Sequence, residues 1–391
     1  MATAVIVDAV RTPGGKRNGR LSGWHPVDLA AETLKALAER NHLDPALVDD
    51  VIMGCVMQVG EQSLNVGRNA VLAAGWPESV PSTTIDRQCG SSQQSAHFAA
   101  QGVISGAYDV VVAAGVECMT RTPMGASIVP GLGMPFGPTV TERYAPAGGL
   151  VPQGISAEMI ADRWGLSRAD LDAFGVQSQR RAIQATEEGR FEAEIVPVAV
   201  KDDQGRETGD VLTADEGLRP GTTAETLAAL KPAFKAGGKV TAGNSSQITD
   251  GASAVLVMSE EKAGQLGLRP RARFHAFALA GVDPVTMLTG PIPATTRVLE
   301  RAGLTLDDID LVEINEAFAS VVLAWEKEHH PDMARVNVNG GAIALGHPLG
   351  CTGTKLLATL VAELERTGGR WGLQTMCEGG GMANATVIER L

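Results

Sequence analysis

The feature that most constrains the fold of this chain is an approximate internal repeat. Three stretches of the first half are matched, in the same order, by stretches near the C-terminus: 48–54 by 306–313, 82–90 by 335–346, and 110–115 by 372–377. Each pair combines a short apolar run with glycine or small residues after it. Any two strand–helix–strand units share some of this likeness. The simplest interpretation is nevertheless a chain of two similar α/β halves.

The spacing of apolar residues supports this interpretation. Short apolar runs typical of buried strands (4–7, 51–54 and 110–115) alternate with stretches of helical spacing (28–40 and 93–104). Such alternation favours a layered α/β fold with parallel strands.

The region 121–245 has a different character. Its first part, Met124 to Leu150, is rich in glycine and proline, and helical segments and a charged turn at 201–206 follow it. We interpret it as an insertion laid over the core. The predicted organisation is therefore an N-terminal half formed by 1–120 together with 246–270, an inserted domain at 121–245, and a C-terminal half at 271–391.

Charge and composition exclude several classes of function. The 33 Lys and Arg against 45 Asp and Glu give a net charge of −12, which argues against bulk binding to nucleic acid or anionic membranes. The longest apolar run, 110–116, is too short to span a bilayer, and no basic and apolar leader opens the chain. Five cysteines without CxxC spacing argue against a disulfide framework or a zinc site. We expect a cytoplasmic protein with no nucleic-acid or membrane partner.

Cys89 is the first candidate for chemistry. It lies between an expected strand and an expected helix, in the run Asp-Arg-Gln-Cys-Gly-Ser-Ser. A thiol at a helix N-terminus meets unpaired N–H groups and the positive end of the helix dipole, and both favour the thiolate. A free cysteine is more often a small buried hydrophobe.

Further polar groups follow other expected strands. His347 lies in a glycine-rich turn, and its imidazole titrates near neutral pH, as a general base requires. Asn315 follows the apolar run 311–314, and Cys377 ends a strand just before three glycines. A lone histidine in a loop is more often incidental. Open α/β sheets, however, place their sites at the carboxyl ends of strands, so the combination is stronger than its parts.

These blocks together resemble the thiolase family over nearly the whole chain. The likeness is carried by the run around Cys89, by Asn-Glu-Ala-Phe at 315–318, by 340–348, and by Cys-Glu-Gly-Gly-Gly at 377–381. The resemblance implies a thiolase fold, α/β and five-layered α-β-α-β-α, made of two duplicated halves with an inserted loop domain that covers CoA. At 93–94 and 330–333 the chain also resembles actinobacterial thiolases of lipid and steroid side-chain breakdown.

The family resemblance also implies roles for the residues. Cys89 is the nucleophile that carries the acyl group, His347 its activating base, and Cys377 the acid and base for the substrate α-proton. His347 and a water held on Asn315 stabilise the enolate oxygen, and the N–H groups of Cys89 and Gly379 form a second oxyanion hole. Claisen chemistry needs these parts. No metal and no permanently bound cofactor is implied, because CoA is a substrate.

Contacts to CoA follow less directly from the resemblance. The run 241–246 resembles the pantetheine-binding loop of the family, with Ser246 at the contacting position, and Arg219 matches an adenine-side residue. A solvated arginine is an equal reading of Arg219. Gln153 stands where many members carry methionine, which leaves the lining of the acyl pocket open.

The expected function is thiolytic cleavage of 3-ketoacyl-CoA to acetyl-CoA and a shortened acyl-CoA, as in fatty acid β-oxidation, with preference for a medium or bulky acyl group. Alternatives are a biosynthetic acetoacetyl-CoA thiolase, a decarboxylating or carrier-linked condensing enzyme, and an inactive thiolase-like lipid-binding protein. The block at Cys377 argues against the condensing enzyme, and the four retained site residues argue against the inactive protein. The uncharged stretch 125–138 and the family predict a homodimer or homotetramer.

Overall fold

A computed structural model describes residues 2–391; Met1, where the predicted N-terminal half begins, lies outside the described residues. The strands are β1 (Ala4–Arg11), β2 (Gly15–Lys16), β3 (Asp50–Gly54), β4 (Ser82–Ile85), β5 (Val110–Cys118), β6 (Val198–Lys201), β7 (Glu207–Leu212), β8 (Thr249–Ser259), β9 (Ala272–Gly281), β10 (Leu311–Ile314), β11 (Trp371–Glu378) and β12 (Met382–Arg390). The α-helices are α1 (Pro26–Arg40), α2 (Val66–Ala73), α3 (Ser91–Ser105), α4 (Pro138–Tyr144), α5 (Gln153–Arg163), α6 (Arg168–Glu187), α7 (Ala224–Ala228), α8 (Glu260–Gln265), α9 (Pro291–Ala302), α10 (Ala319–His329), α11 (Ala342–Leu345) and α12 (Thr352–Thr367).

One long sheet runs through both halves of the protein. Within residues 2–391 its order is β10-β11-β12-β9-β1-β8-β5-β3-β4, with β2 beside β8. Within this sheet the halves join where β1 meets β9, through the pairs Val5–Arg273 and Ile6–Ala272. The sheet is therefore two smaller sheets in sequence, with a short ladder between them.

The two halves share one topology, which confirms the predicted duplication. In the first half β3 pairs in parallel with β4 and β5, and β8 and β1 follow antiparallel. In the second half β10 pairs in parallel with β11 and bridges in parallel from Val312 to Val336, and β12 and β9 follow antiparallel. Each half thus repeats the same order of parallel and antiparallel neighbours.

The prediction of a parallel sheet was wrong for the last strand of each half. β11 and β12 are joined by the short glycine turn 379–381, and a connection of this length permits only antiparallel pairing. Gly380 and Gly381 both have φ near +80° (82° and 81°), the left-handed region that glycine favours. The sequence shows the apolar runs but not the direction in which a neighbouring strand returns.

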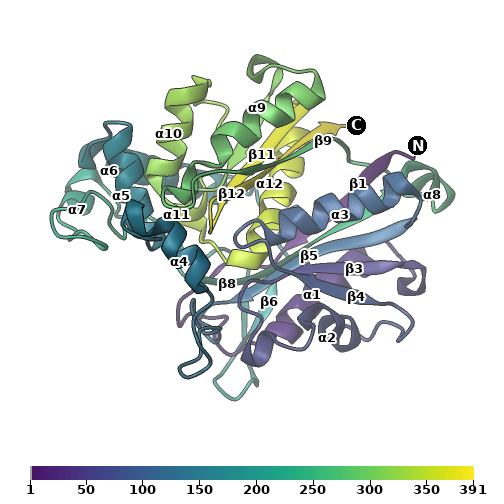
Figure 1. The fold of residues 1–391 in the computed structure, drawn as a ribbon. Coiled ribbons are helices and arrows are strands. Elements are labelled where there is room, and N and C mark those ends of the chain that lie inside the picture. Colours follow the sequence, from purple (N-terminus) through teal and green to yellow (C-terminus); the bar gives the residue numbers. More distant parts are fainter. Residues whose placement is uncertain (1) are drawn as a thin grey trace.

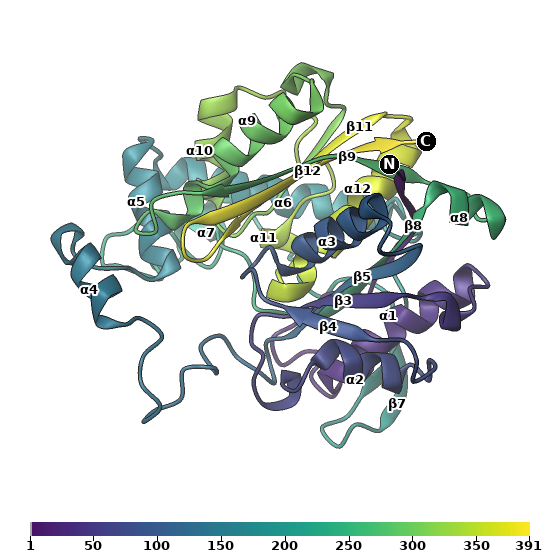
Figure 2. The ribbon, with the colours of Figure 1, turned by 45° about the vertical axis from the view of Figure 1, so that its right-hand side comes forward.

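Helices lie between the two sheets and on their outer faces, so that helices and sheets alternate in five layers (Figure 1 and Figure 2). α1 and α2 pack on the outer face of the first sheet, α9 packs on the outer face of the second, and α10 lies beside α9. α3 and α12 pack against each other between the sheets, where alanines of α3 and leucines of α12 form a continuous core with both sheets. The central pair of helices therefore lies where the two halves meet.

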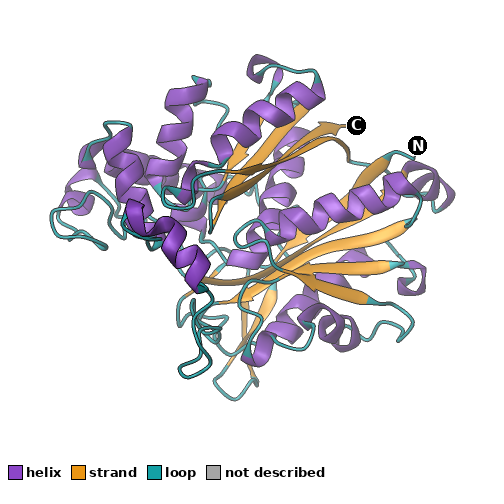
Figure 3. Cartoon of the chain, viewed as in Figure 1, coloured by secondary structure: helices purple, strands orange, loops and turns teal. Residues whose placement is uncertain are grey.

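The chain between β5 and β8 forms the helices α4 to α7 and the separate ladder β6–β7. These helices lie to one side of the sheets (Figure 3), where α5 and α6 pack on α10 and α6 packs on α11. The sequence fixes the start of α6 locally, because the Ser167 side chain accepts from the Asp170 N–H while the Asp170 carboxylate accepts from the Ser167 N–H. No helix of residues 2–391 has the length and apolarity needed to cross a bilayer.

Candidate active site

Cys89 lies in a tight turn between β4 and α3. Gln88 adopts a positive φ of 48°, which is uncommon for a residue with a side chain. The Ser91 hydroxyl fixes this turn, since it accepts from the Arg87 N–H at 2.9 Å and donates to the Gln88 carbonyl at 2.6 Å. The thiol of Cys89 is held, buried, just before the first turn of α3.

A cavity of about 410 Å³ reaches Cys89 from the surface of the molecule. Its lining consists mostly of apolar side chains with two glutamines and two glycines: Val56, Met57, Gln88, Cys89, Met124, Phe136, Leu150, Val151, Pro152, Gln153, Pro284, Met287, Leu349, Gly379 and Gly380. Gly379, predicted as an oxyanion donor, therefore shares this cavity with Cys89. A cavity of this composition suits an acyl chain attached to a small polar group.

Burial governs the ionisation of the Cys89 thiol. Desolvation raises the pKa of Cys89 to about 12, and a negative charge on Glu378 adds to this effect. Hydrogen bonding from the Gly379 backbone and the Gln153 side chain lowers the pKa. The expectation that the helix N-terminus favours the thiolate is thus wrong for the protein without substrate, because the loss of water outweighs the helix.

Cys377 lies near the end of β11, close enough to Cys89 for a charge on Cys89 to influence it. It is fully buried, and it pairs across the ladder with Ala383 of β12. Burial raises its thiol pKa well above the usual value, and a negative charge on Cys89 raises it further. Two thiols that influence each other in this way favour states in which only one is ionised.

His347 lies in the loop after α11, and its side chain is oriented by a threonine. Nδ1 lies 2.6 Å from the Thr352 hydroxyl, which itself donates to the Pro348 carbonyl at 2.8 Å. Because that hydroxyl proton is already used, Thr352 accepts from Nδ1–H, and the lone pair is left on Nε2. Burial lowers the pKa of His347 to about 3, so the ring is neutral. A neutral imidazole with a free Nε2 is a proton acceptor.

The side-chain amide of Asn315 approaches Nε2 of His347. Asn315 directly follows β10, is buried, and places Nδ2 3.4 Å from His347 Nε2. The loop that carries His347 also approaches the nucleophile turn, since Leu349 and Cys89 belong to one apolar cluster. The structure thus places Asn315 against His347, and the loop of His347 against the turn of Cys89.

Of the two residues predicted for CoA, Arg219 lines a second cavity, of about 640 Å³, formed by the loop before α7 and the segment 242–247. Arg219 donates to Gln247 Oε1 at 3.2 Å and to the Glu216 carbonyl at 3.0 Å. Ser246 donates its backbone N–H to the Ala317 carbonyl at 3.0 Å. Its neighbour Gln247 lines the cavity, whereas Ser246 does not.

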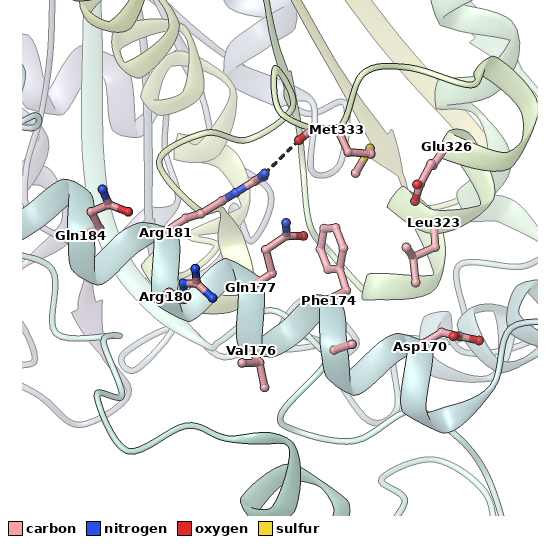
Figure 4. A pocket seen from close by; sticks show the side chains of 11 residues that line it. Asp170, Phe174, Val176, Gln177, Arg180, Arg181, Gln184, Leu323, Glu326 and Met333 are labelled. Atoms are coloured by element: carbon pink, nitrogen blue, oxygen red, sulfur yellow. Dashed lines mark hydrogen bonds between the residues drawn. The ribbon is translucent and has the colours of Figure 1, made fainter.

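A larger hollow, of about 760 Å³, lies between α6 and α10 and contains none of the predicted site residues (Figure 4). Arg181 extends along it and donates to the carbonyls of Met333 at 2.8 Å and Val336 at 2.6 Å. Its guanidinium therefore holds the loop after α10.

Sequence reasoning missed three residues around the site. Thr352 orients His347 from five residues further along the chain. Lys355 is an ionisable side chain buried near His347, and Glu378 is one buried against the turn that carries Cys89. The sequence held a signal for these two: a lone lysine in an apolar helix, and a lone glutamate between a buried strand and three glycines.

Comparison with known proteins places these features in one family. Residues 4–261 match the model of the family "Thiolase, N-terminal domain", and residues 268–390 match "Thiolase, C-terminal domain". The steroid 3-ketoacyl-CoA thiolase FadA6 of Mycobacterium tuberculosis is 51% identical over 100% of this chain and 95% of its own. The 3-ketoacyl-CoA thiolase of Bacillus subtilis is 46% identical over the full length of both.

Solved structures show the same similarity. The crystal structure of the Bacillus anthracis acetyl-CoA acetyltransferase superposes with a TM-score of 0.91 at 41% identity, covering 100% of this chain and 99% of that one. The human mitochondrial 3-ketoacyl-CoA thiolase superposes with a TM-score of 0.89 at 37% identity, with the same coverage.

Proposed function

The chain belongs to the thiolase family of acyltransferases, and on this premise we propose that it cleaves 3-ketoacyl-CoA with CoA to give acetyl-CoA and a shortened acyl-CoA. The observation that carries the proposal is the apolar cavity in which Cys89 and Gly379 lie side by side, with Cys377 adjacent to Cys89. Relatives named 3-ketoacyl-CoA thiolase, at 45–51% identity, support it.

The first half-reaction forms an acyl-enzyme. His347 Nε2 takes the proton of the Cys89 thiol, and the sulfur attacks the 3-keto carbon. The N–H groups of Cys89 and Gly379 bind the oxyanion that forms there. The bond between C2 and C3 then breaks, which leaves the acyl group on Cys89 and an acetyl-CoA enolate, and Cys377 gives its proton to C2.

The second half-reaction restores the enzyme. The thiol of CoA loses its proton to the Cys377 thiolate, and the CoA sulfur attacks the thioester on Cys89. The Cys89 thiolate leaves and recovers its proton from His347. The enolate oxygen that forms in the first half-reaction is stabilised by protonated His347 and by a water on Asn315. Each thiolate in this scheme forms only while a proton acceptor is in place.

We assign the second cavity to CoA, which is a substrate and not a resident cofactor. The segment 121–245 is then the loop domain over CoA, and 1–120 with 246–270 and 271–391 are the two halves. The lining from both 218–230 and 242–247 supports this division. Arg219 faces the nucleotide end, and the segment containing Ser246 holds the pantetheine.

We infer a medium or bulky acyl group as the preferred substrate. The support is the apolar lining of the 410 Å³ cavity and the relative FadA6, which is named for steroid substrates. The alternative, synthesis of acetoacetyl-CoA, is supported by the likeness to the Bacillus anthracis acetyl-CoA acetyltransferase.

We further propose a homodimer or homotetramer in the cytoplasm. Exposed apolar side chains concentrate on the segment 124–140: Met124, Ile128, Val129, Leu132, Met134, Phe136 and Val140. Such a surface is typical of a contact between copies. In residues 2–391 all five cysteines are free and buried, as suits a reducing compartment.

The central experiment couples turnover to intact-protein mass spectrometry. With a 3-ketoacyl-CoA, the wild type should turn over repeatedly only when CoA is present, and when CoA is withheld it should stop after one equivalent and accumulate one acyl adduct. Cys89→Ala should lose both properties. Cys118→Ala, which removes another buried thiol, is the matched control and should keep them. An adduct that persists in Cys89→Ala would contradict the role of Cys89, and the absence of CoA-dependent cleavage would favour a lipid-binding protein.

A further inference from the structure

Glu378 occupies an unusual position between two residues of the proposed chemistry. It ends β11, with Cys377 before it and Gly379 after it, and its side chain is fully buried. Neither carboxylate oxygen has a hydrogen-bond partner among residues 2–391. Buried polar groups are normally paired, so this carboxyl group requires an explanation.

Glu117 provides the contrast. It is equally buried, but its carboxylate accepts from the N–H groups of Val56 (2.9 Å), Met57 (3.1 Å) and Gly350 (2.9 Å) and from the Gln62 side chain (2.7 Å). Both oxygens of the Glu117 carboxylate are therefore paired. The oxygens of Glu378 have no such partners among residues 2–391. Burying a carboxyl group in such surroundings costs less free energy when the group is protonated and neutral.

The Glu378 carboxyl group lies directly against the nucleophile turn. Any Cβ on Gly90, the residue after Cys89, would collide with Glu378 Oε1 and would lie 2.8 Å from Asn384 Nδ2. Asn384 of β12 also donates to the Gly90 carbonyl at 3.0 Å. The turn that carries Cys89 therefore rests on the side chains of Glu378 and Asn384.

The ionisable and charged groups that face Glu378 come from two elements. Asp86, Arg87 and Cys89 belong to the turn between β4 and α3, and Cys377 belongs to β11 itself. β12 contributes the uncharged Asn384. Burial is the largest influence and raises the pKa of Glu378 to about 8; Asp86 acts in the same direction, and Arg87 opposes both. A charge on Glu378 in turn raises the thiol pKa of Cys89 and of Cys377.

We propose that Glu378 is a positioning residue that stays protonated during turnover and whose ionisation suppresses thiolate formation at both Cys89 and Cys377. As the neutral acid it fills the space behind the nucleophile turn without repelling either thiolate. As a carboxylate it places a negative charge beside both sulfurs. One residue then controls both half-reactions, since each half-reaction passes through one of the two thiolates.

The consequence for turnover rests on the proposed function, but the ionisation can be measured without substrate. The rate at which iodoacetamide alkylates Cys89, located by peptide mapping, reports the thiolate fraction at each pH. For Glu378→Gln, which keeps the shape and removes the charge, we expect alkylation at pH 9 to be about tenfold faster than in the wild type, the effect of one pKa unit. Below pH 6, where Glu378 is neutral, the two rates should agree.

Two further proteins sharpen the test. Glu187→Gln removes one negative charge from the exposed end of α6 and should leave the alkylation profile unchanged. If Glu378→Gln does not fold, the alkylation profile of the wild type still tests the proposal. The logarithmic rate of the wild type should rise with pH at unit slope, flatten above about pH 8 as Glu378 ionises, and rise again at higher pH.

The results that overturn the inference are equally specific. A wild-type profile of unit slope straight through pH 8, or a Glu378→Gln profile that coincides with the wild type at every pH, excludes control by Glu378. Failure of the proposed catalytic role of Cys89 would appear separately, as a missing acyl adduct with the alkylation profile intact.

Discussion

Lys355 donates a hydrogen bond from Nζ to the main-chain oxygen of Leu345 at 2.7 Å, and a longer one of 3.3 Å to Gly346, the residue before His347. Lys355 is buried on α12, and its ammonium group thereby joins the central helix to the loop that carries the proposed base. Burial is also the largest influence on its own ionisation and lowers its pKa, while Asp215 acts in the opposite direction.

We predict that Lys355→Met lowers kcat/KM at least tenfold while the protein stays folded. The substitution leaves two buried carbonyls without their donor, which costs about 1–3 kcal/mol of stability and frees the His347 loop. Steady-state kinetics and urea unfolding measure the two effects. Lys327→Met is the matched control, because Lys327 donates to the Trp164 carbonyl at 2.8 Å but is exposed. Unchanged kcat/KM in a destabilised Lys355→Met would show that Lys355 supports only the fold.

The adjacency of Cys89 and Cys377 predicts a separation of the half-reactions. In Cys377→Ala the proton donor for C2 is lost but the nucleophile remains. We expect thiolysis to fall at least about a hundredfold, the usual size of a general acid–base effect. Cys89 should still be acylated by an acyl-CoA, because the departing CoA thiolate, unlike the carbon C2, can take its proton from water. In His347→Ala both steps should fail. Stopped-flow thiolysis and mass spectrometry of the acyl adduct give the two readings, and an equal loss of both steps in Cys377→Ala contradicts the assigned role.

The parts of this structure that were predictable from the sequence are those determined by short stretches of chain. The duplication could be predicted because each half repeats the same order of apolar runs and glycines, and the helix spacing in 28–40 and 93–104 is local. The turn at Cys89 is likewise encoded within a few residues, where Ser91 caps the loop.

The properties missed by sequence reasoning depend on contacts between distant segments. The Cys89 thiol packs among residues 56, 349 and 376, which exclude water from it. Burial therefore raises the pKa of Cys89, whereas the helix N-terminus alone was expected to lower it. Glu378 has no hydrogen-bond partner among residues 2–391, and the Asn384 amide that β12 brings to the same turn donates to the Gly90 carbonyl. Antiparallel pairing of β12 likewise depends on a turn, not on the apolar pattern of the strand.

Two buried histidines predict acid sensitivity. Burial lowers the pKa of His97 and of His347 from 6.5 to about 3, and both are neutral in the folded protein. Below pH 6.5 these histidines are protonated in the unfolded chain but not in the folded chain. The free energy of unfolding therefore keeps their full contribution above pH 6.5 and loses it as the pH falls toward 3. Each histidine should cost about 2 kcal/mol at pH 5.

Urea unfolding from pH 7.5 to pH 5 measures this slope. His97→Gln should flatten it, because the amide can replace the contact of 2.7 Å to the Thr386 hydroxyl without titrating. His275→Gln, at an exposed position on β9, is the control and should keep the wild-type slope. A slope that is the same in all three proteins contradicts the assignment.

The exposed apolar segment predicts the oligomeric state. Leu132 is 82% exposed and Met134 67%, values that a contact between copies would reduce. Light scattering of the wild type at micromolar concentration should give a multiple of 40.7 kDa. Replacing both residues with aspartate should shift the distribution toward smaller species, whereas aspartate at Thr208, exposed on β7, should not. A wild type that is entirely monomeric rejects the proposal.

Gln153 predicts how the acyl cavity treats chain length. Its side chain lines the cavity, and hydrogen bonding from it lowers the pKa of the Cys89 thiol, so it belongs to the reacting end of the pocket. In Gln153→Met we expect kcat/KM to fall between about tenfold and about a hundredfold for every 3-ketoacyl-CoA, because one hydrogen bond to a charged group contributes about 1.5–3 kcal/mol. In Phe136→Ala, which removes apolar lining, the loss should instead grow with chain length, since each buried methylene contributes about 0.8 kcal/mol. A panel from four to sixteen acyl carbons separates the two patterns. A wild type that favours acetoacetyl-CoA in both directions and excludes longer chains would replace the degradative assignment with the biosynthetic one.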